Sequence, residues 1–184
     1  ASMSTLKQAI EAYMIGRGIK NDGVNMAASI MVIDLETGEE MAINPDVAYS
    51  AMSTVKIPIL INVMSYFDFA IPDDYRWLMA ASILCSSNSA SNLLMQTVGN
   101  NDMAAGLTRV TNTIETLGAT NSFINANIFV DPNAKPVVVA RPTTHPDPTF
   151  NTRPDGNSQT TAGDMATLLQ EIYDCAEYNS GLRA

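Results

Sequence analysis

The sequence is poor in cysteine, histidine and tryptophan: it has two, one and one of these among 184 residues. Cys85 and Cys175 show no metal-ligand spacing, and His145 stands alone. This scarcity excludes a recognisable zinc site, and we expect no metal and no cofactor. A disulfide between the two cysteines is not excluded by sequence. The apolar run around Cys85 favours a buried free thiol there.

Long apolar runs and positive charge are scarce as well. The stretch 57–64 is interrupted by Pro58 and Asn62, and no run reaches the roughly 20 residues of a membrane span. Ten Lys and Arg residues are scattered among 19 Asp and Glu, with a net charge of −9. This balance excludes nucleic acid and anionic membrane as natural partners. Residues 1–20 lack the apolar core of a signal peptide, so we expect either a cytoplasmic chain or a mature form.

Length and composition predict about one globular domain. Apolar spacing and turn residues predict its elements in order. They are a helix over 4–17 capped by Ser4 with an apolar face of Leu6, Ile10, Tyr13 and Met14; a strand at 28–33; a turn at 34–38; a return strand at 40–44; a helix opening at Ser53; a largely buried helix from Pro72 containing Trp77, Leu78, Met79, Ile83 and Leu84; a helix ending at Gly99; a helix over 101–117; an extended segment at 123–129; a long loop over 131–159; and a helix from Met165 to about Cys175, capped by Thr160 and Thr161.

The most informative stretch contains Ser53 and Lys56. On a helix, residues three apart share a face, so the two side chains are expected to meet. The start of a helix also supplies free backbone N–H groups and positive partial charge. A base and nearby donors suit a nucleophilic serine. Burial on an apolar helix lowers the pKa of a lysine, and only the neutral amine acts as a base.

The Ser-x-x-Lys pattern is weak by itself, since about one chance match is expected in a chain of this length. Ser4 and Lys7 provide such a second match, which we interpret as the cap and an exposed residue of a surface helix. The match that begins at Ser53 differs from the one at Ser4 because it follows two predicted strands and opens a helix without a polar face. Pro58 within that helix predicts a local distortion.

A second polar cluster, Ser86, Ser87 and Asn88, lies between two predicted helices. Two interpretations stay open. The hydroxyl groups serve a packed helix connection by bonding to the backbone, or Ser86 and Asn88 point into a cleft. The loop over 131–159 is also unusual, because loops of this length are mostly functional or disordered.

In this order, Ser-Thr-Val-Lys at 53–56 and Ser-Ser-Asn at 86–88, followed by Ser-Ala-Ser-Asn-Leu-Leu, resemble the motifs of penicillin-recognising serine enzymes. The sequence is most similar to class A β-lactamases over roughly residues 5–175. The turn segment 32–38, Pro58, and Thr160-Thr161 with Asp164-Met165 add to the likeness. The resemblance implies an α+β fold of the β-lactamase/transpeptidase type, in which the N-terminal hairpin joins a mixed sheet beside an all-helical region.

The resemblance also implies roles. Ser53 is the acylated nucleophile, Lys56 its general base or proton relay, and Ser86 passes a proton to the departing nitrogen. Asn88 binds Lys56 and the substrate amide, and the Ser53 backbone N–H forms part of the oxyanion hole. The implied partner is a small molecule, a β-lactam or a peptidoglycan-like peptide. A D-alanyl-D-alanine peptidase, an esterase and a non-catalytic cell-wall or partner-binding protein are the alternatives. A periplasmic or secreted location is expected.

Three departures from class A enzymes stand out. Ser87 occupies a position where they carry Asp, and no Lys-Thr/Ser-Gly motif is present. No Glu occurs between Glu115 and Glu171, where they place the Glu that activates the deacylating water. Among the loop acids Asp131, Asp147 and Asp155, Asp155 is the alternative to that Glu, because it lies shortly before Thr160, although its side chain is one methylene shorter. We prefer to interpret Asp155 as a turn residue. We therefore expect slow deacylation.

The resemblance predicts that residues 1–184 are the first two-thirds of one catalytic domain. Its parts are a helix and hairpin at 4–48, a helical region with the motifs at 49–129, a loop at 130–159 and a helix at 160–176. The two strands of 28–44 form no stable sheet by themselves. We therefore expect the chain to be incomplete, with a complementary C-terminal fragment that carries the missing strands as a partner.

Overall fold

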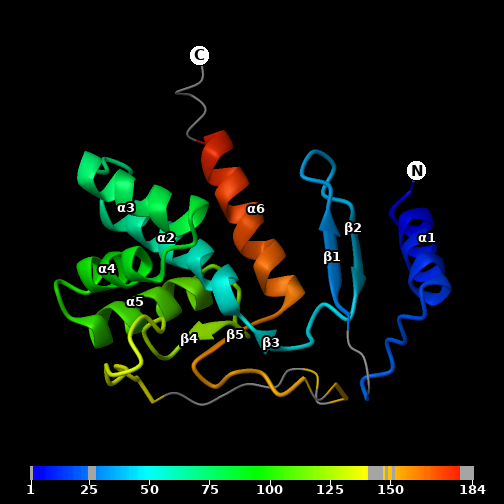
Figure 1. Cartoon of the computed structure of the whole chain (residues 1–184). Helices are drawn as coiled ribbons and strands as arrows, with labels where there is room; N and C mark the ends of the chain where they lie inside the picture. Colours follow the sequence, from blue (N-terminus) through cyan, green and yellow to red (C-terminus); the bar gives the residue numbers. More distant parts are fainter. Residues whose placement is uncertain (1, 25–27, 141–146, 148, 151, 179–184) are drawn as a thin grey trace.

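The structure is a computed structural model that describes residues 2–24, 28–140, 147, 149–150 and 152–178. Figure 1 shows its arrangement, with most helices gathered on one side of the molecule. The elements are α1 (Met3–Gly16), β1 (Ile30–Ile33), β2 (Glu40–Ile43), β3 (Tyr49–Ser50), the 3-10 turn η1 (Met52–Val55), α2 (Lys56–Tyr66), α3 (Asp73–Leu84), α4 (Asn88–Val98), α5 (Met103–Thr116), β4 (Phe123–Ile124), β5 (Ser158–Thr160) and α6 (Ala162–Tyr178).

The predicted hairpin is present as an antiparallel pair of β1 and β2, with Ile30 opposite Ile43. Its turn is closed by Asp34, whose carboxylate accepts the backbone N–H of Thr37 at 3.0 Å. Gly38 adopts a φ of 72°, which suits glycine. The hairpin lies between α1, which packs on β2, and α6, which packs on β1 (Figure 1).

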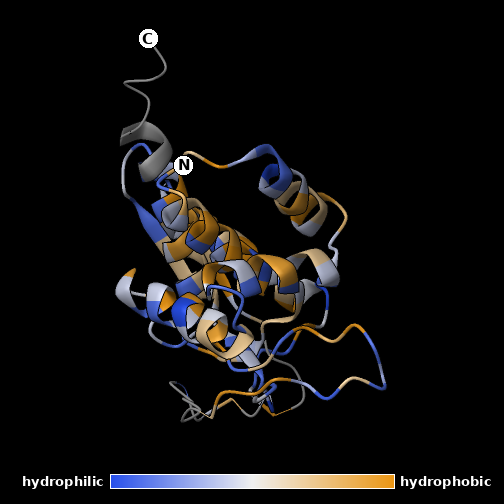
Figure 2. Ribbon diagram, turned by 90° about the vertical axis from the view of Figure 1, so that its left-hand side faces the viewer, coloured by the Kyte–Doolittle hydropathy of each residue, from blue (hydrophilic) through white to orange (hydrophobic). Residues whose placement is uncertain are grey.

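The core lies where α2, α4 and α5 pack together, and Figure 2 shows apolar residues concentrated in the middle of the molecule. α4 and α5 approach closely at Gly106, where an added Cβ would lie 2.0 Å from the carbonyl oxygen of Met95. Each fully buried Ile or Leu contributes about 1.5–3 kcal/mol to stability. The fully buried residues of this cluster include Ile59, Val63, Leu94, Met95, Leu107, Val110 and Leu168.

A second small sheet, in the order β3-β5-β4, ties together three distant parts of the chain. Tyr49 pairs with Thr160, and Phe123 pairs with Gln159. The N–H of Ala51 also donates to the carbonyl of Ser158 at 3.1 Å. The start of η1 is thereby anchored to the end of the long loop.

The structure corrects the prediction for the first helix. Its cap is Ser2, not Ser4: the Ser2 hydroxyl accepts the N–H of Thr5 at 3.3 Å. Only Met14 of the expected apolar face is buried, and Tyr13 is 61% exposed. The physical reason is that, among the described elements, α1 makes extensive contacts with β2 only.

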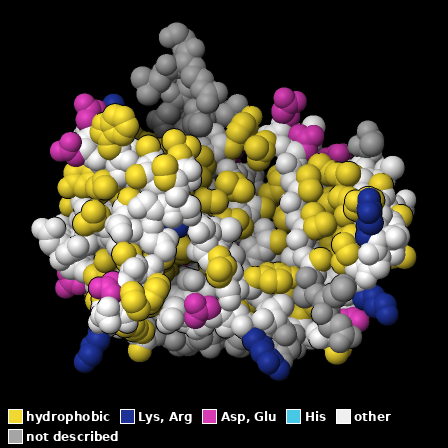
Figure 3. All heavy atoms as spheres, viewed as in Figure 1, with side chains coloured by type: hydrophobic (Ala, Val, Ile, Leu, Met, Phe, Trp, Pro, Cys, Tyr) yellow, Lys and Arg dark blue, Asp and Glu magenta, His cyan; other side chains and the backbone are white. Residues whose placement is uncertain are grey.

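Two predictions about burial near α3 were wrong. Trp77 and Leu84 are 77% and 81% exposed, and Ser82 is the fully buried residue of the helix. Cys85, expected to be a buried thiol, is exposed. α3 packs on α4 and α2 with one side only, so its other apolar side chains face outward. Figure 3 shows apolar side chains reaching the surface in several places on the face in view.

Described parts of the predicted loop over 131–159 form regular pairing. Its last two residues belong to β5, and Val138 forms an isolated bridge with Ala126, which precedes the loop. Of the extended segment expected at 123–129, only Phe123–Ile124 forms a strand. The last helix begins at Ala162, three residues before the expected start, and reaches Tyr178. Its predicted cap is confirmed at Thr161, whose hydroxyl accepts the N–H of Asp164 at 3.0 Å.

Asp164 joins α6 to the segment after α5. Its Oδ2 accepts the Ser122 hydroxyl at 2.7 Å and the Asn121 backbone N–H at 2.8 Å. The side chain is buried, and this burial raises the pKa of Asp164 above its usual 3.8, against the opposing effect of these hydrogen bonds. Ionised Asp164 is therefore stabilised by donors but opposed by desolvation.

We expect Asp164→Ala to lower the free energy of unfolding by about 1–3 kcal/mol, because two buried donors lose their acceptor. Asp164→Asn keeps an acceptor oxygen and costs less. Folding raises the pKa of this group, so its stabilising effect is complete below pH 3.8 and is lost as pH rises through the raised value. The wild-type protein should thus lose stability relative to D164N as pH increases, measured by urea unfolding. A wild-type advantage that grows with pH contradicts this account.

Candidate active site

Ser53 lies in the 3-10 turn η1, immediately before α2. The helical run starts as a tight 3-10 turn and becomes α-helical at Lys56, and α2 then continues through Pro58 without a break. Met52, directly before the serine, has a φ of 49°, an unusual value for a methionine. Ser53 is exposed, so its hydroxyl is accessible at the surface of the molecule.

Lys56 opens α2 with its side chain in the interior, at 2% exposure. Its Nζ lies 3.2 Å from the Ser53 Oγ, as the spacing of three residues predicts. It also lies 2.9 Å from the Ser86 Oγ and 3.0 Å from the Ser86 carbonyl oxygen. The fourth neighbour is the Oδ1 of Asn88, at 2.9 Å. The predicted convergence of these four residues is confirmed by the distances.

The segment 85–88 brings its side chains to Lys56 through a sharp bend between α3 and α4. Ser86 has a φ of 52°, and its Oγ lies 3.1 Å from the Ser53 Oγ. Ser87 caps α4 by accepting the N–H of Ala90 at 3.2 Å. Both sequence interpretations of the cluster therefore apply: Ser87 serves the backbone, while Ser86 and Asn88 face Lys56.

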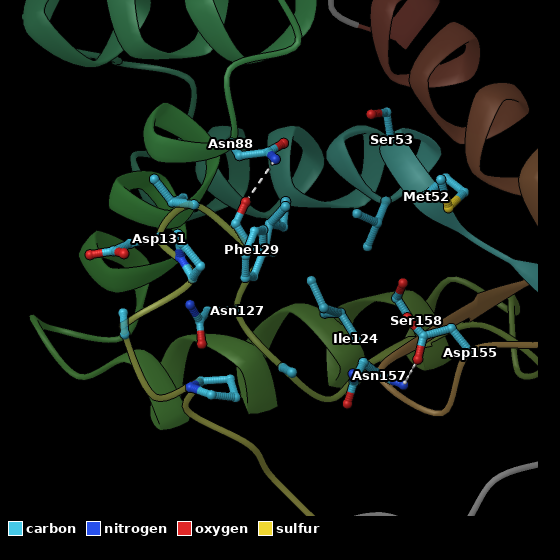
Figure 4. Close-up of a pocket in the computed structure, with 17 residues that line it drawn as sticks. Met52, Ser53, Asn88, Ile124, Asn127, Phe129, Asp131, Asp155, Asn157 and Ser158 are labelled. Carbon is cyan, nitrogen blue, oxygen red and sulfur yellow. Dashed lines mark hydrogen bonds between the residues drawn. The ribbon is translucent and has the colours of Figure 1, made fainter.

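The amide of Asn88 is held in one orientation. Its Nδ2 donates to the carbonyl oxygen of Phe129 at 2.9 Å (Figure 4). Its Oδ1 is thereby left to accept from the Lys56 Nζ. The Asn88 Oδ1 and the Ser86 carbonyl oxygen can only accept hydrogen bonds. A neutral amine has two N–H groups and one lone pair. If both N–H groups of a neutral Lys56 are donated to these acceptors, its one lone pair can accept the hydroxyl proton of either Ser53 or Ser86, whose Oγ atoms lie 3.2 and 2.9 Å away.

The environment also favours that neutral form. Burial lowers the pKa of Lys56 from its usual 10.5, as expected from the sequence. Among the described residues, no carboxylate forms an ion pair with this amine; the single ion pair there joins Arg76 and Asp73 at the surface. A lysine without a carboxylate partner loses its proton more readily than a paired one.

A pocket of about 580 Å³ lies beside Ser53 and Asn88. Other lining residues come from β4, from the residues that follow it and from the end of the long loop, and include Ile124, Phe129 and Asp155 (Figure 4). Sequence reasoning missed this part of the pocket lining and the Phe129 carbonyl. A backbone oxygen has no side-chain signature, and the unusual length of the loop was the one available signal.

Asp155 has the turn role that the sequence predicts. Its Oδ1 accepts the N–H of Asn157 at 2.9 Å, and its own N–H donates to the Ser50 hydroxyl at 2.8 Å. Asp131 similarly accepts the N–H of Asn133 at 2.8 Å. Both residues line the pocket. Asp147 accepts the N–H of Thr149 at 3.0 Å and is not among the residues that line the pocket.

The described part of the chain has no group of three or more His, Cys, Asp or Glu residues arranged to hold a metal ion. No helix in that part is long and apolar enough to cross a membrane. His145 lies outside the described residues, as does the side chain of Cys175.

Comparison with known proteins agrees with the geometry. The sequence profile of the beta-lactamase enzyme family matches residues 5–69 and 74–183. No curated protein sequence matches the chain. The crystal structure of a β-lactamase from Desulfarculus baarsii is similar, with a TM-score of 0.59 at 16% identity over 94% of this chain and 63% of that one.

Two D-alanyl-D-alanine carboxypeptidases have similar structures. The Francisella tularensis protein has a TM-score of 0.55 at 20% identity, over 84% of this chain and 38% of its own. The Mycobacterium tuberculosis protein has a TM-score of 0.51 at 18% identity, over 78% of this chain and 54% of its own. The chain thus spans less than two thirds of the solved structures it matches. These likenesses confirm the predicted α+β fold of the β-lactamase/transpeptidase type.

With the family profile matching on both sides of residues 70–73 and the fold shared with solved β-lactamases and carboxypeptidases, the chain belongs to the beta-lactamase enzyme family.

Proposed function

We propose that the protein is a serine acyl-transfer hydrolase of the β-lactamase and penicillin-binding type, with Ser53 as nucleophile. One observation carries the proposal: an exposed serine hydroxyl lies 3.2 Å from a buried lysine amine that makes no ion pair with a described carboxylate. A nucleophile and a base within hydrogen-bonding reach, with the base oriented by a third group, are the requirement for covalent catalysis. Here Asn88 and the Ser86 carbonyl orient the base.

The proposed acylation step balances in protons and bonds. Neutral Lys56 accepts the proton of the Ser53 hydroxyl while the Oγ attacks the carbonyl carbon of an amide. The carbonyl oxygen becomes an oxyanion, for which the Ser53 backbone N–H is a donor near the start of a helical run. The C–N bond then breaks, and Ser86, 2.9 Å from the Lys56 Nζ, relays the proton from Lys56 to the departing nitrogen. The product is an ester of Ser53, and Lys56 is neutral again.

Deacylation is the weaker half of the proposed cycle. A water molecule must attack the ester with help from a base, and such help is typically worth ~10²–10⁴ in rate. No Glu occurs between Glu115 and Glu171. The Oδ1 of Asp155 already accepts a turn N–H. We therefore propose that acyl-Ser53 persists.

A D-alanyl-D-alanine peptidase is the second candidate. Two carboxypeptidases share the fold, and Ser87 replaces the Asp of class A enzymes in the second motif. An enzyme that forms a durable penicillin adduct while cleaving peptides fits the same Ser53, Lys56 and Ser86. A non-catalytic family member that binds a cell-wall peptide or a partner takes no covalent label.

The first prediction of the proposed mechanism concerns trapping of the acyl-enzyme. A chromogenic cephalosporin mixed with the purified protein in a stopped-flow instrument should release one equivalent of product quickly and then turn over slowly. Mass spectrometry should find the adduct on the Ser53 peptide, and Ser53→Ala should show neither burst nor adduct while unfolding at the same temperature. Fast steady turnover without a trapped adduct rules out slow deacylation; absence of any adduct with both this probe and a fluorophosphonate rules out the enzyme.

The second prediction concerns pH. Because burial lowers the pKa of Lys56 below 10.5, the fraction of neutral amine at a given pH is larger than for an exposed lysine. The acylation rate should rise with pH and level off above the lowered pKa. Lys56→Met should remove this dependence and slow acylation by about 10²–10⁴.

Lys20→Met is the matched control, since Lys20 is exposed and outside the site. It should keep both the rate and the profile of the wild type. An unchanged profile in Lys56→Met would assign the base to another group.

A further inference from the structure

The lining of the pocket beside Ser53 indicates which substrate side chains fit the site, which Ser53, Lys56 and Ser86 by themselves do not. Resting on the function proposed above, we propose that this pocket holds the acyl side chain of the substrate and selects apolar side chains without negative charge. Positively charged apolar side chains are favoured further. The argument uses the position, the wall and the charges of the pocket.

The position follows from the residues that form it. Ser53 and Asn88 line the pocket, and other lining residues lie on β4 and the loop beyond it (Figure 4). An amide carbonyl seated on the Ser53 Oγ therefore has its flanking groups directed along this space. At about 580 Å³ the pocket is of the size that binds small ligands.

The wall is apolar where it meets solvent. Met52, Phe129 and Val130 line the pocket and are 76%, 68% and 52% exposed. Ile124 and Val55 line it as buried residues. Large apolar side chains exposed around one cavity mark a binding surface more often than an inert one. An aromatic or aliphatic group entering here removes apolar surface of both partners from water.

Of the described residues that line the pocket, the two charged ones are both acidic. Asp131 and Asp155 lie on opposite sides of it in Figure 4, and both side chains are exposed at its rim. Each uses its Oδ1 to accept a backbone N–H two residues ahead. Lys135 and Arg153 are close in sequence but do not line the pocket. Among the described residues, a negatively charged ligand group thus meets two carboxylates and no accessible lining cation, since Lys56 is buried behind Ser53.

The experiment uses three penicillins with one nucleus and one aromatic ring. They differ at the side-chain α carbon, which bears hydrogen in benzylpenicillin, an ammonium group in ampicillin and a carboxylate in carbenicillin. Second-order acylation rate constants should fall in the order ampicillin, benzylpenicillin, carbenicillin, by about threefold to tenfold per step at low ionic strength. Salt at about 1 M should narrow the differences, because rim charges are screened.

Variants distinguish an effect of the charges at the pocket from an effect of the net charge of the protein. Asp131→Asn combined with Asp155→Asn should bring the three rate constants within about twofold of one another, by the same screening logic. Asp68→Asn is the matched control: this exposed aspartate follows the far end of α2 and does not line the pocket, so the ranking should persist. Met52→Ser should slow all three penicillins by a similar factor.

The outcomes are distinguishable from failure of the proposed function. Acylation of Ser53 by all three compounds at equal rates, or fastest by carbenicillin, overturns the selectivity while leaving the enzyme in place. A ranking that survives in the double Asp variant places the selectivity elsewhere and also overturns it. If none of the three acylates Ser53, the proposed function itself fails and this inference fails with it.

Discussion

The burial of Lys56 is the interaction on which the rest of the site depends. An amine at 2% exposure must find partners for its N–H groups or remain deprotonated, because an unpaired buried charge is costly. Its partners come from the chain 30 residues later, where the bend between α3 and α4 presents the Ser86 carbonyl and the Asn88 amide. The packing of α2 against α4 therefore determines both the fold of this region and the basicity of the amine.

Through Asn88, the environment of Lys56 also depends on the loop that follows β4. Its amide joins the Lys56 Nζ on one side to the Phe129 carbonyl on the other. An amide bound in this way cannot rotate without losing both hydrogen bonds and placing its NH₂ group against the amine. The loop after β4 thus stabilises the lysine through one intermediate residue, Asn88. Among the described residues of this loop, none forms a hydrogen bond with the lysine itself. Movement of this loop would alter the surroundings of Lys56 as well as the pocket.

The parts of the site that sequence reasoning predicted are those with local or motif-level causes. Ser53 and Lys56 meet because residues three apart share a helical face, and Ser86 and Asn88 were found because two motifs occur in order. The Phe129 carbonyl and the pocket wall depend on loop geometry that no residue type indicates. The burial of Trp77 and Cys85 was predicted wrongly for a related reason: apolar character shows that a side chain favours burial, but the contacts of α3 with α4 and α2 determine which face obtains it.

In this structure, the residues proposed for the reaction and those proposed for substrate selection lie on different kinds of secondary-structure element. The proposed nucleophile Ser53 and its proposed base Lys56 lie on a 3-10 turn and a helix whose apolar side chains belong to the core, so their positions change little without cost to stability. The pocket wall lies on short strands and turns, where Asp131 and Asp155 each close a turn through a backbone N–H. Replacing either aspartate alters the charge at the rim of the pocket and leaves the hydrogen-bond partners of Lys56 in place. Several hydrogen bonds link the two parts, among them those of Asn92 with the Ile128 backbone and of the Ala51 N–H with the Ser158 carbonyl. The Phe129 carbonyl is the link that reaches Lys56 through Asn88, so a change of backbone there would affect both parts.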